Sequence, residues 1–260
     1  MSHFTKRPED IEILVEAGKR HAAILTILAE MVLPGVSTHT LNETAEKLIV
    51  DGGDEPAFLG YTPEGASRPY PAGLCVSVND AIVHGIPNEH PLILKEGDIV
   101  GLDLGVRHNG MITDSALTVP VGKIDAVAKK LIQATREALQ AGIAHARAGN
   151  TTGDIGEAIE RVATSYGFPV VSELGGHGVG YRVHEEPFVP NFGTKGEGEP
   201  LVPGMVLALE PILSEGSSRI KLDRDGYTYR TRDGSRSAHF EHTIVITDGP
   251  ARVLTRREGE

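Results

Sequence analysis

IVGLDLGVRHNGMITDSALTV, residues 99–119, consists of two apolar segments on either side of an Asn109-Gly110 dipeptide. Two-residue type I′ turns prefer Asn-Gly, because both central residues must adopt positive φ. Valine, isoleucine and threonine are frequent in the flanking segments, as they are in β-strands. The sequence therefore predicts a β-hairpin with strands over residues 99–107 and 111–119.

Each predicted strand carries one aspartate within its apolar run. With a two-residue loop, Asp103 faces Ala116 and Asp114 faces Gly105, so the acids are diagonal neighbours on one face, roughly 7–8 Å apart. Buried carboxylates without partners are very costly, and no Lys or Arg interrupts these runs. A metal ion between the acids would resolve the conflict, and exposure to solvent or ion pairing are the alternatives.

Three more residues extend this pattern. Glu210 lies within MVLALEPIL and Glu241 precedes HTIVIT, in segments that predict a second strand pair over residues 205–213 and 240–247. His177 lies in GGHGVG, which we interpret as a glycine-rich loop that lets a ligand approach closely. A phosphate cradle is the alternative, but the Lys-Ser/Thr of a P-loop is missing.

The predicted elements occur twice in the same order, which indicates an α+β fold with two similar halves. Similar positions recur at nearly constant offsets: Glu46 and Glu160, His84 and His184, and Asp103 and Glu210. Chance similarity of helix starts and strands is the alternative. We expect a single domain, 1–260, with halves of about 8–120 and 121–250. The predicted helices span residues 7–33, 40–50, 124–146 and 155–166, and a strand begins at LCVSVN.

Composition excludes several classes of protein. The 260 residues are 40% hydrophobic and 23% charged, as in ordinary globular proteins, and the net charge of -11 argues against nucleic-acid binding. No signal-peptide core or membrane-length apolar stretch is present, so we expect a cytoplasmic protein without membrane contact. Cys75 is the single cysteine, so any metal must be held by nitrogen and oxygen ligands.

Four carboxylates and one imidazole suit two divalent ions, with Mn, Fe, Co and Zn as candidates. Such a pair activates water and polarises a carbonyl, so hydrolysis is the chemistry that we expect. Other nucleophiles have little support, since G-x-S-x-G and H-E-x-x-H are absent. Cys75 lies in an apolar strand, where a buried thiol packs as a small hydrophobic group.

Six segments together resemble type I methionine aminopeptidases: VNDAIVHGIP, GDIVGLDLGV, ITDSALTV, GGHGVGYRVHEEP, MVLALEP and SAHFEHTIVIT. The resemblance runs from about residue 8 to residue 247 and implies the pita-bread fold, with pseudo-two-fold halves around a curved antiparallel sheet. It also implies that Asp103, Asp114 and Glu241 hold one ion. Asp114, His177, Glu210 and Glu241 would surround the other ion, with Glu210 as the proton shuttle.

The resemblance further implies that His84 and His184 contact the scissile peptide and stabilise the tetrahedral intermediate. A turn residue without a catalytic role is the alternative for His84. Six residues match the wall of the methionine pocket, although each could be ordinary core, and the segment 62–69 between them is longer than in familiar bacterial members. The six are Phe58, Tyr61, Tyr70, Cys75, Val183 and Tyr227.

The expected activity is removal of the N-terminal methionine from nascent proteins and peptides with a small second residue. We expect a monomer whose ribosome contact, if made, uses the catalytic domain, because a Cys/His-rich N-terminal extension is missing. A proline-specific aminopeptidase or prolidase is the nearest rival, but the roughly 100 residues before Asp103 leave no room for its further N-terminal domain. A non-catalytic binding module is the other alternative, although its ligand residues would usually have decayed.

Overall fold

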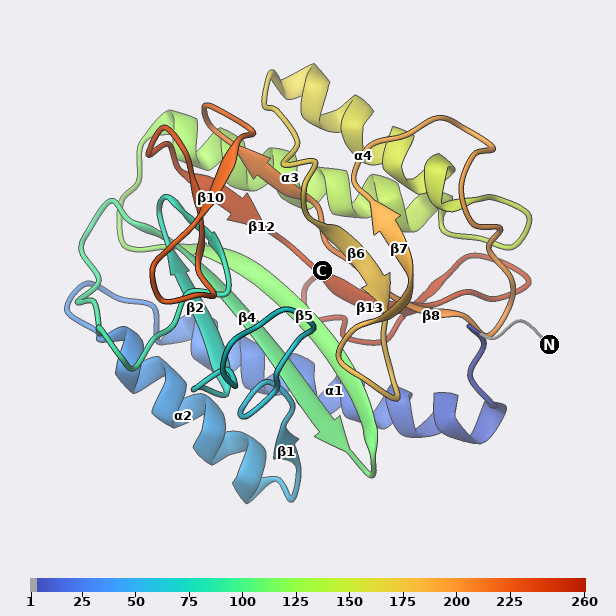
Figure 1. Cartoon of the computed structure of the whole chain (residues 1–260), viewed down its shortest axis with the longest axis horizontal. Coiled ribbons are helices and arrows are strands. Elements are labelled where there is room, and N and C mark those ends of the chain that lie inside the picture. Colours follow the sequence, from blue (N-terminus) through green and yellow to red (C-terminus); the bar gives the residue numbers. More distant parts are fainter. Residues whose placement is uncertain (1–3) are drawn as a thin grey trace.

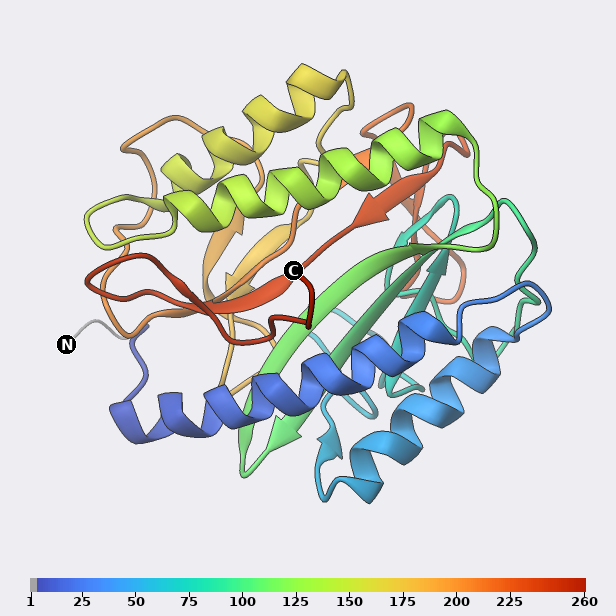
Figure 2. The ribbon, with the colours of Figure 1, turned by 180° about the vertical axis from the view of Figure 1, so that it is seen from behind.

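Helices cover one face of the strands in the computed structural model, which describes residues 4–260. Figure 2, seen from behind, shows the blue helix α1 and the green helix α3 in front of the strands, whereas the strands lie in front in Figure 1. The first three residues of the predicted domain lie outside the described range. The helices are α1 (Pro8–Glu30), α2 (Thr38–Asp51), α3 (Ala126–His145) and α4 (Thr152–Tyr166).

The helix boundaries follow from local chemistry. Pro8 begins α1, where its missing N–H costs nothing, and acidic residues follow in the first turn. The side chains of Ser37 and Asp125 accept backbone N–H groups at the starts of α2 and α3. Thr151 and Asp154 form a reciprocal capping box at the start of α4. Within residues 4–260, no helix is long and apolar enough to cross a membrane.

Each helix pair buries its apolar face against a different group of strands. Leu25 and Leu28 of α1 pack in one cluster with Leu102 of β4, whereas Leu131 of α3 packs in another with Leu207 of β8. All five side chains have no exposed surface. The division into two similar halves is consistent with this arrangement and stays a prediction.

The predicted hairpin is present as β4 (Ile99–His108) and β5 (Met111–Pro120). Both loop residues have positive φ, as a type I′ turn requires. The register is the predicted one, so Asp103 and Asp114 are diagonal neighbours on one face. β4 also pairs with β1 (Glu55–Pro56) and β2 (Leu74–Val78), and a separate small sheet contains β3 (Ala81–Val83), β10 (Ile220–Leu222) and β11 (Tyr229–Thr231).

The predicted strand pair of the second half was wrong in its bounds. The predicted strand 205–213 is divided at Glu210. The predicted strand 240–247 is shortened to residues 242–245, and an interruption at Glu241 separates it from a further strand that was not predicted. The pairing register is the same on both sides of the interruption. Because Pro211 has no N–H, it cannot donate a ladder hydrogen bond at this point. The resulting strands are β8 (Val206–Leu209), β9 (Ile212–Ser214), β12 (Ser237–His239) and β13 (His242–Val245).

His177 lies on a strand, so its assignment to a loop was also wrong. β6 (Gly175–Gly178) is held between β7 (Glu185–Pro190) and β8, and β13 pairs with β14 (Arg252–Val253) at the sheet edge. A Cβ atom at Gly176 would lie 2.3 Å from the carbonyl oxygen of Ala208, and one at Gly178 would lie 2.2 Å from that of Glu186. Glycine is therefore needed for the close approach of neighbouring backbones.

Hydroxyl groups join β5 to the strands of the second half. The hydroxyl of Thr243 accepts the Asp114 N–H at 2.9 Å and donates to the Asp114 carbonyl oxygen at 2.7 Å. Thr118 makes the same pair of contacts with the backbone of His239. Farther along, the Glu241 N–H donates to the Ala116 carbonyl oxygen at 2.9 Å. These bonds fix the positions of residues from the two halves relative to one another.

Replacing Thr243 with valine tests these bonds, because valine keeps the shape but leaves two buried backbone groups of Asp114 without their partner. We expect the free energy of unfolding to fall by about 2–4 kcal/mol, measured by urea denaturation in EDTA. Thr164→Val on an exposed position of α4 is the control and should change stability by less than about 0.5 kcal/mol. Equal stability of the two variants would contradict the role of the hydroxyl.

Candidate functional site

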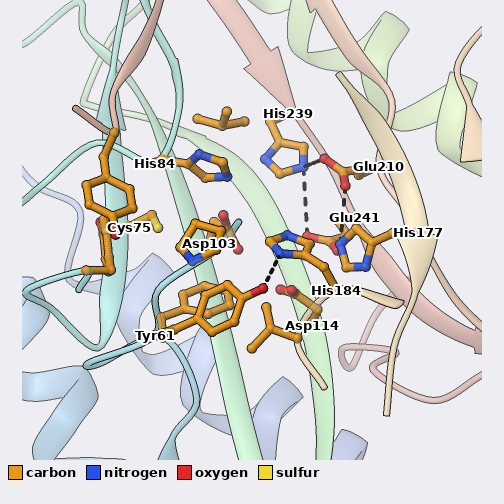
Figure 3. A pocket seen from close by; sticks show the side chains of 16 residues that line it. Tyr61, Cys75, His84, Asp103, Asp114, His177, His184, Glu210, His239 and Glu241 are labelled. Carbon is orange, nitrogen blue, oxygen red and sulfur yellow. Dashed lines mark hydrogen bonds and ion pairs between the residues drawn. The ribbon is translucent and has the colours of Figure 1, made fainter. Parts of the chain in front are cut away.

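Every site residue predicted from the sequence lines one cavity of about 550 Å³. Figure 3 shows side chains from distant parts of the chain pointing toward one another in this cavity. The acidic and imidazole groups that we expected to act on metal or substrate are Asp103, Asp114, His177, Glu210, Glu241, His84 and His184. The predicted pocket wall is Phe58, Tyr61, Tyr70, Cys75, Val183 and Tyr227.

The acids of the cavity come from the first hairpin and from the interruptions in the second strand pair. Asp103, Asp114 and Glu241 are nearly completely buried. Within residues 4–260, one carboxylate oxygen of each of these three has no hydrogen-bond partner. Ligand atoms of Asp114, His177 and Glu241 all lie within 4.8 Å of one another. Orphaned carboxylate oxygens beside an imidazole are the donor set that a divalent transition metal requires, so these residues fit a metal ion.

Burial perturbs the ionisation of all four carboxyl groups. It raises the pKa of Asp103 to about 7 and raises the pKa of Asp114 well above its ordinary value. The pKa values of Glu210 and Glu241 are also raised by burial and, secondarily, by the other acids nearby. A divalent cation would favour the charged forms and reverse this shift, so metal binding and proton release are coupled here.

The hydrogen bond of His177 selects the form of its ring that can bind a metal. Its Nδ1 lies 2.9 Å from the carbonyl oxygen of Gly178, which can only accept, so Nδ1 carries the proton. Burial lowers the pKa of His177 to about 3, so the ring is neutral. Nε2 therefore presents its lone pair to the cavity, 3.5 Å from Oε1 of Glu210.

His84 and His184 stand beside the acids. His84 follows β3 with a φ of 57°, a conformation that a non-glycine residue rarely adopts, and burial lowers its pKa to about 4. The Nδ1 atom of His184 lies 3.0 Å from the Tyr61 hydroxyl, and its ring meets that of His177 edge-on at 4.5 Å. Burial also lowers the pKa of His184, so two neutral imidazoles line the cavity beside the acids.

An aromatic wall adjoins the acids. The rings of Tyr70 and Tyr227 meet edge-on at 5.1 Å, and the Tyr70 hydroxyl donates to the carbonyl oxygen of Gly85 at 3.0 Å. Phe58 packs over Gly105, where a Cβ atom would lie 2.6 Å from the ring. The wall therefore combines apolar surface with hydroxyl groups that are already hydrogen-bonded.

The segment 62–69 forms the outer part of this wall and is held by Arg68. The Arg68 guanidinium makes a bidentate ion pair with Glu89 and donates to the carbonyl oxygen of Asp225 at 3.0 Å. The hydroxyl of Tyr227 donates to the Arg68 carbonyl oxygen. Pro63, which lines the cavity, is in the same segment. Arg68 therefore fixes the segment to two other parts of the chain.

Sequence reasoning missed three residues that line the cavity: Pro63, Val83 and His239. His239 is the most polar of them and is 4% exposed. A signal for it existed, since alternation along a strand brings residues two apart to one face and Glu241 follows at that spacing. Pro63 and Val83 had no comparable signal beyond their nearness to Tyr61 and His84.

Comparison with known proteins identifies the family of this chain. The model of metallopeptidase family M24 matches residues 12–248. A methionine aminopeptidase of Aquifex aeolicus is 47% identical over 248 residues, which are 95% of this chain and 96% of that protein. The crystal structure of a methionine aminopeptidase from Thermotoga maritima has a TM-score of 0.92 and 40% identity, and covers 97% of this chain and 99% of that one. The chain belongs to metallopeptidase family M24 and, within it, to the methionine aminopeptidases.

The predicted resemblance and the predicted pita-bread fold are thereby confirmed. A prolidase from Pyrococcus horikoshii has a TM-score of 0.75 but only 22% identity, and this chain covers 65% of its length. That similarity shows a shared fold alone. The rival assignment to the prolidases is therefore less favoured than the assignment to the methionine aminopeptidases.

The raised carboxyl pKa values predict how metal stabilises the protein. Without metal, the folded protein keeps protons on these carboxyl groups that the unfolded chain releases above about pH 4. The stability that these bound protons contribute is therefore lost as the pH rises through about 7. Mn²⁺ needs the ionised forms, so the rise in Tm that it causes should grow from pH 5.5 to 7.5. Thermal unfolding with EDTA or Mn²⁺ measures this.

Matched variants show whether Mn²⁺ raises the Tm by binding in the cavity. Asp103→Asn removes one carboxylate without changing its shape and should reduce the rise in Tm, whereas Asp51→Asn at an exposed position of α2 should not. A rise in Tm that shrinks with pH, or that is equal in both variants, would contradict the metal assignment.

Proposed function

We propose that this protein removes the N-terminal methionine from peptides and nascent proteins with a small second residue. One observation carries the proposal: buried carboxylates and imidazoles adjoin an aromatic pocket in a single cavity. The acids fit metal-assisted hydrolysis, and the pocket fits an apolar side chain next to the scissile bond. Membership of the methionine aminopeptidase group supports the same activity.

The five predicted ligands would hold two divalent ions. Asp103, Asp114 and Glu241 would hold one, and the other would lie among Asp114, His177, Glu210 and Glu241. Their orphaned oxygens and the neutral His177 ring support this set. When bound, the ions would lower the pKa of a water molecule and polarise the scissile carbonyl. Carboxylate and imidazole ligands suit Mn, Fe, Co and Zn alike, so each is a candidate.

The remaining polar residues would guide protons and orient the substrate. Glu210 is a carboxyl group that lines the cavity beside the other acids, a position that suits a proton shuttle to the leaving amine. His84 and His184 are neutral and can donate hydrogen bonds to the scissile peptide as negative charge develops on it. The contact of Tyr61 with His184 holds one of these rings in place.

The aromatic wall would select methionine by shape and apolar contact. A thioether packs favourably against aromatic rings, and the edge-on pair Tyr70 and Tyr227 offers such surfaces. Cys75 is 3% exposed and burial raises the pKa of its thiol, so the thiol would serve as part of the wall and not as a nucleophile. The rings of His177 and His184, 4.5 Å apart, take up space in the cavity beside the acids, which supports a small second residue.

The same proposal assigns the partners of the protein. Its partners would be the N-termini of nascent chains, which it would meet in the cytoplasm as a monomer. A transient ribosome contact would bring it to them as they emerge. The net charge of -11 indicates that such a contact would not rest on direct nucleic-acid binding.

Peptide assays test the activity directly. With Mn²⁺, Fe²⁺ or Co²⁺, the protein should release methionine from Met-Ala-Ser with a kcat/KM roughly 100-fold or more above that for Met-Lys-Ser. Glu210→Gln should abolish turnover, because the amide cannot carry the proton. Cleavage of Ala-Pro peptides in place of Met-Ala-Ser would support the prolidase rival. If the protein is inactive with all three metals, the result would support the alternative of a non-catalytic binding module.

The role of the segment 62–69 is testable through Arg68. Replacing Arg68 with alanine removes about 1 kcal/mol of half-exposed contacts, so KM for Met-Ala-Ser should rise roughly twofold to fivefold with kcat nearly unchanged. The KM of Arg68→Lys should lie between that of the unaltered protein and that of Arg68→Ala, because an ammonium group cannot form the bidentate pair. Arg161→Ala on an exposed position of α4 is the control. An unchanged KM in Arg68→Ala would refute the role.

A further inference from the structure

His239 is a buried imidazole in the cavity to which none of the steps above assigns a role. Its ring is 4% exposed, and within residues 4–260 its Nε2 has no hydrogen-bond partner. An unsatisfied buried polar atom costs about 1–3 kcal/mol, so its retention in a well-packed site calls for a reason. Figure 3 shows the ring directed toward the acids.

Two carboxylates face this nitrogen. Oε2 of Glu210 lies 3.6 Å from Nε2 of His239, and Oε2 of Glu241 lies 3.8 Å from it. A neutral imidazole carries one N–H, on either Nδ1 or Nε2. In the ionised form that metal binding requires, Glu210 and Glu241 can only accept, so the tautomer of His239 that avoids repulsion has the proton on Nε2.

The backbone that carries the His239 ring is held at both of its polar groups. The backbone N–H and carbonyl of His239 both bond to the hydroxyl of Thr118, at 2.9 Å each, and β12 pairs with β9. Glu210 has a longer side chain and lies at the interruption between β8 and β9. A small rotation of the Glu210 carboxylate therefore shortens the 3.6 Å separation to a hydrogen bond, as often happens when an active site fills.

The Glu210 carboxylate faces an imidazole on each side. Its Oε1 lies 3.5 Å from Nε2 of His177, and its Oε2 faces His239. His177 presents a lone pair, so it cannot donate to the carboxylate, whereas the Nε2–H of His239 can. His239 is therefore the group in this contact that can orient the Glu210 carboxylate by hydrogen bonding.

We propose that His239 is a positioning residue, which donates its Nε2–H to the carboxylate of Glu210 and holds it ready for metal binding and proton transfer. The inference rests on the proposed function, since it gives Glu210 its role there. Partners that orient a ligand typically contribute about 10–100-fold to metal affinity or activity.

Two amides of different length separate hydrogen bonding from packing. The amide nitrogen of glutamine reaches the place of the imidazole Nε2, whereas that of asparagine reaches the place of Nδ1. His239→Gln should therefore keep both activity and metal affinity within about threefold of the unaltered protein. His239→Asn and His239→Leu should lose about 10–100-fold in kcat on Met-Ala-Ser, with KM nearly unchanged.

Calorimetric titration of Mn²⁺ into the metal-free full chain gives a readout independent of activity. At least one dissociation constant should rise about tenfold in the Asn and Leu variants and recover in the Gln variant. If Leu binds Mn²⁺ and turns over peptide normally, His239 only fills space and the proposal fails. If Gln is as defective as Leu, His239 is a direct metal ligand and the proposal also fails. If the unaltered protein cleaves no peptide, the proposed function fails, whereas the titration still tests His239.

Discussion

The burial of several carboxylates in one cavity is the constraint on which the rest of this structure depends. Asp103, Asp114 and Glu241 have almost no exposed surface and each has an oxygen without a partner among residues 4–260. Negatively charged groups that line one small cavity of low dielectric constant repel each other strongly. A site with this arrangement is costly unless a cation is bound or protons are taken up, and both outcomes are consistent with the raised pKa values of the acids.

The fold maintains this costly arrangement by holding the acids with backbone bonds. The hydroxyl of Thr243 bonds to both backbone groups of Asp114 on β5. The backbone N–H of Glu241 bonds to the carbonyl oxygen of Ala116, which also lies on β5. The carboxylates of the two halves therefore converge because the strands that carry them are joined. The interruptions at Glu210 and Glu241 release these two residues from the regular ladder while keeping its register.

The parts of the fold that were predicted from the sequence depend on local chemistry. The hairpin was predictable because Asn109-Gly110 sets the turn, and the turn then sets which residues face each other. The interruption at Glu210 was not predicted, because an apolar run gives no sign of where a ladder of hydrogen bonds breaks. Pro211 was a usable signal for it. His177 was assigned to a loop because glycine-rich segments usually avoid strands. The close approach of β7 and β8 that requires those glycines arises only in the folded chain.

The candidate site was more predictable than the strands that carry it, because charged residues in apolar runs stand out in any sequence. His239 escaped notice, since a histidine in a strand has no such contrast, and its closeness to Glu210 depends on pairing between distant segments. The pocket wall was predicted through resemblance alone. Its anchoring by Arg68 depends on contacts with two distant segments, which a sequence pattern does not reveal.

The central claim is that the buried acids exist to hold two divalent ions. Crystals grown with Mn²⁺, with diffraction data recorded at the manganese absorption edge, test it most directly. If the buried acids hold two ions, two anomalous peaks should appear about 3.5–4 Å apart, with Asp114 and Glu241 between them. Anomalous peaks elsewhere, or a cavity that stays free of metal at saturating Mn²⁺ and neutral pH, would contradict it.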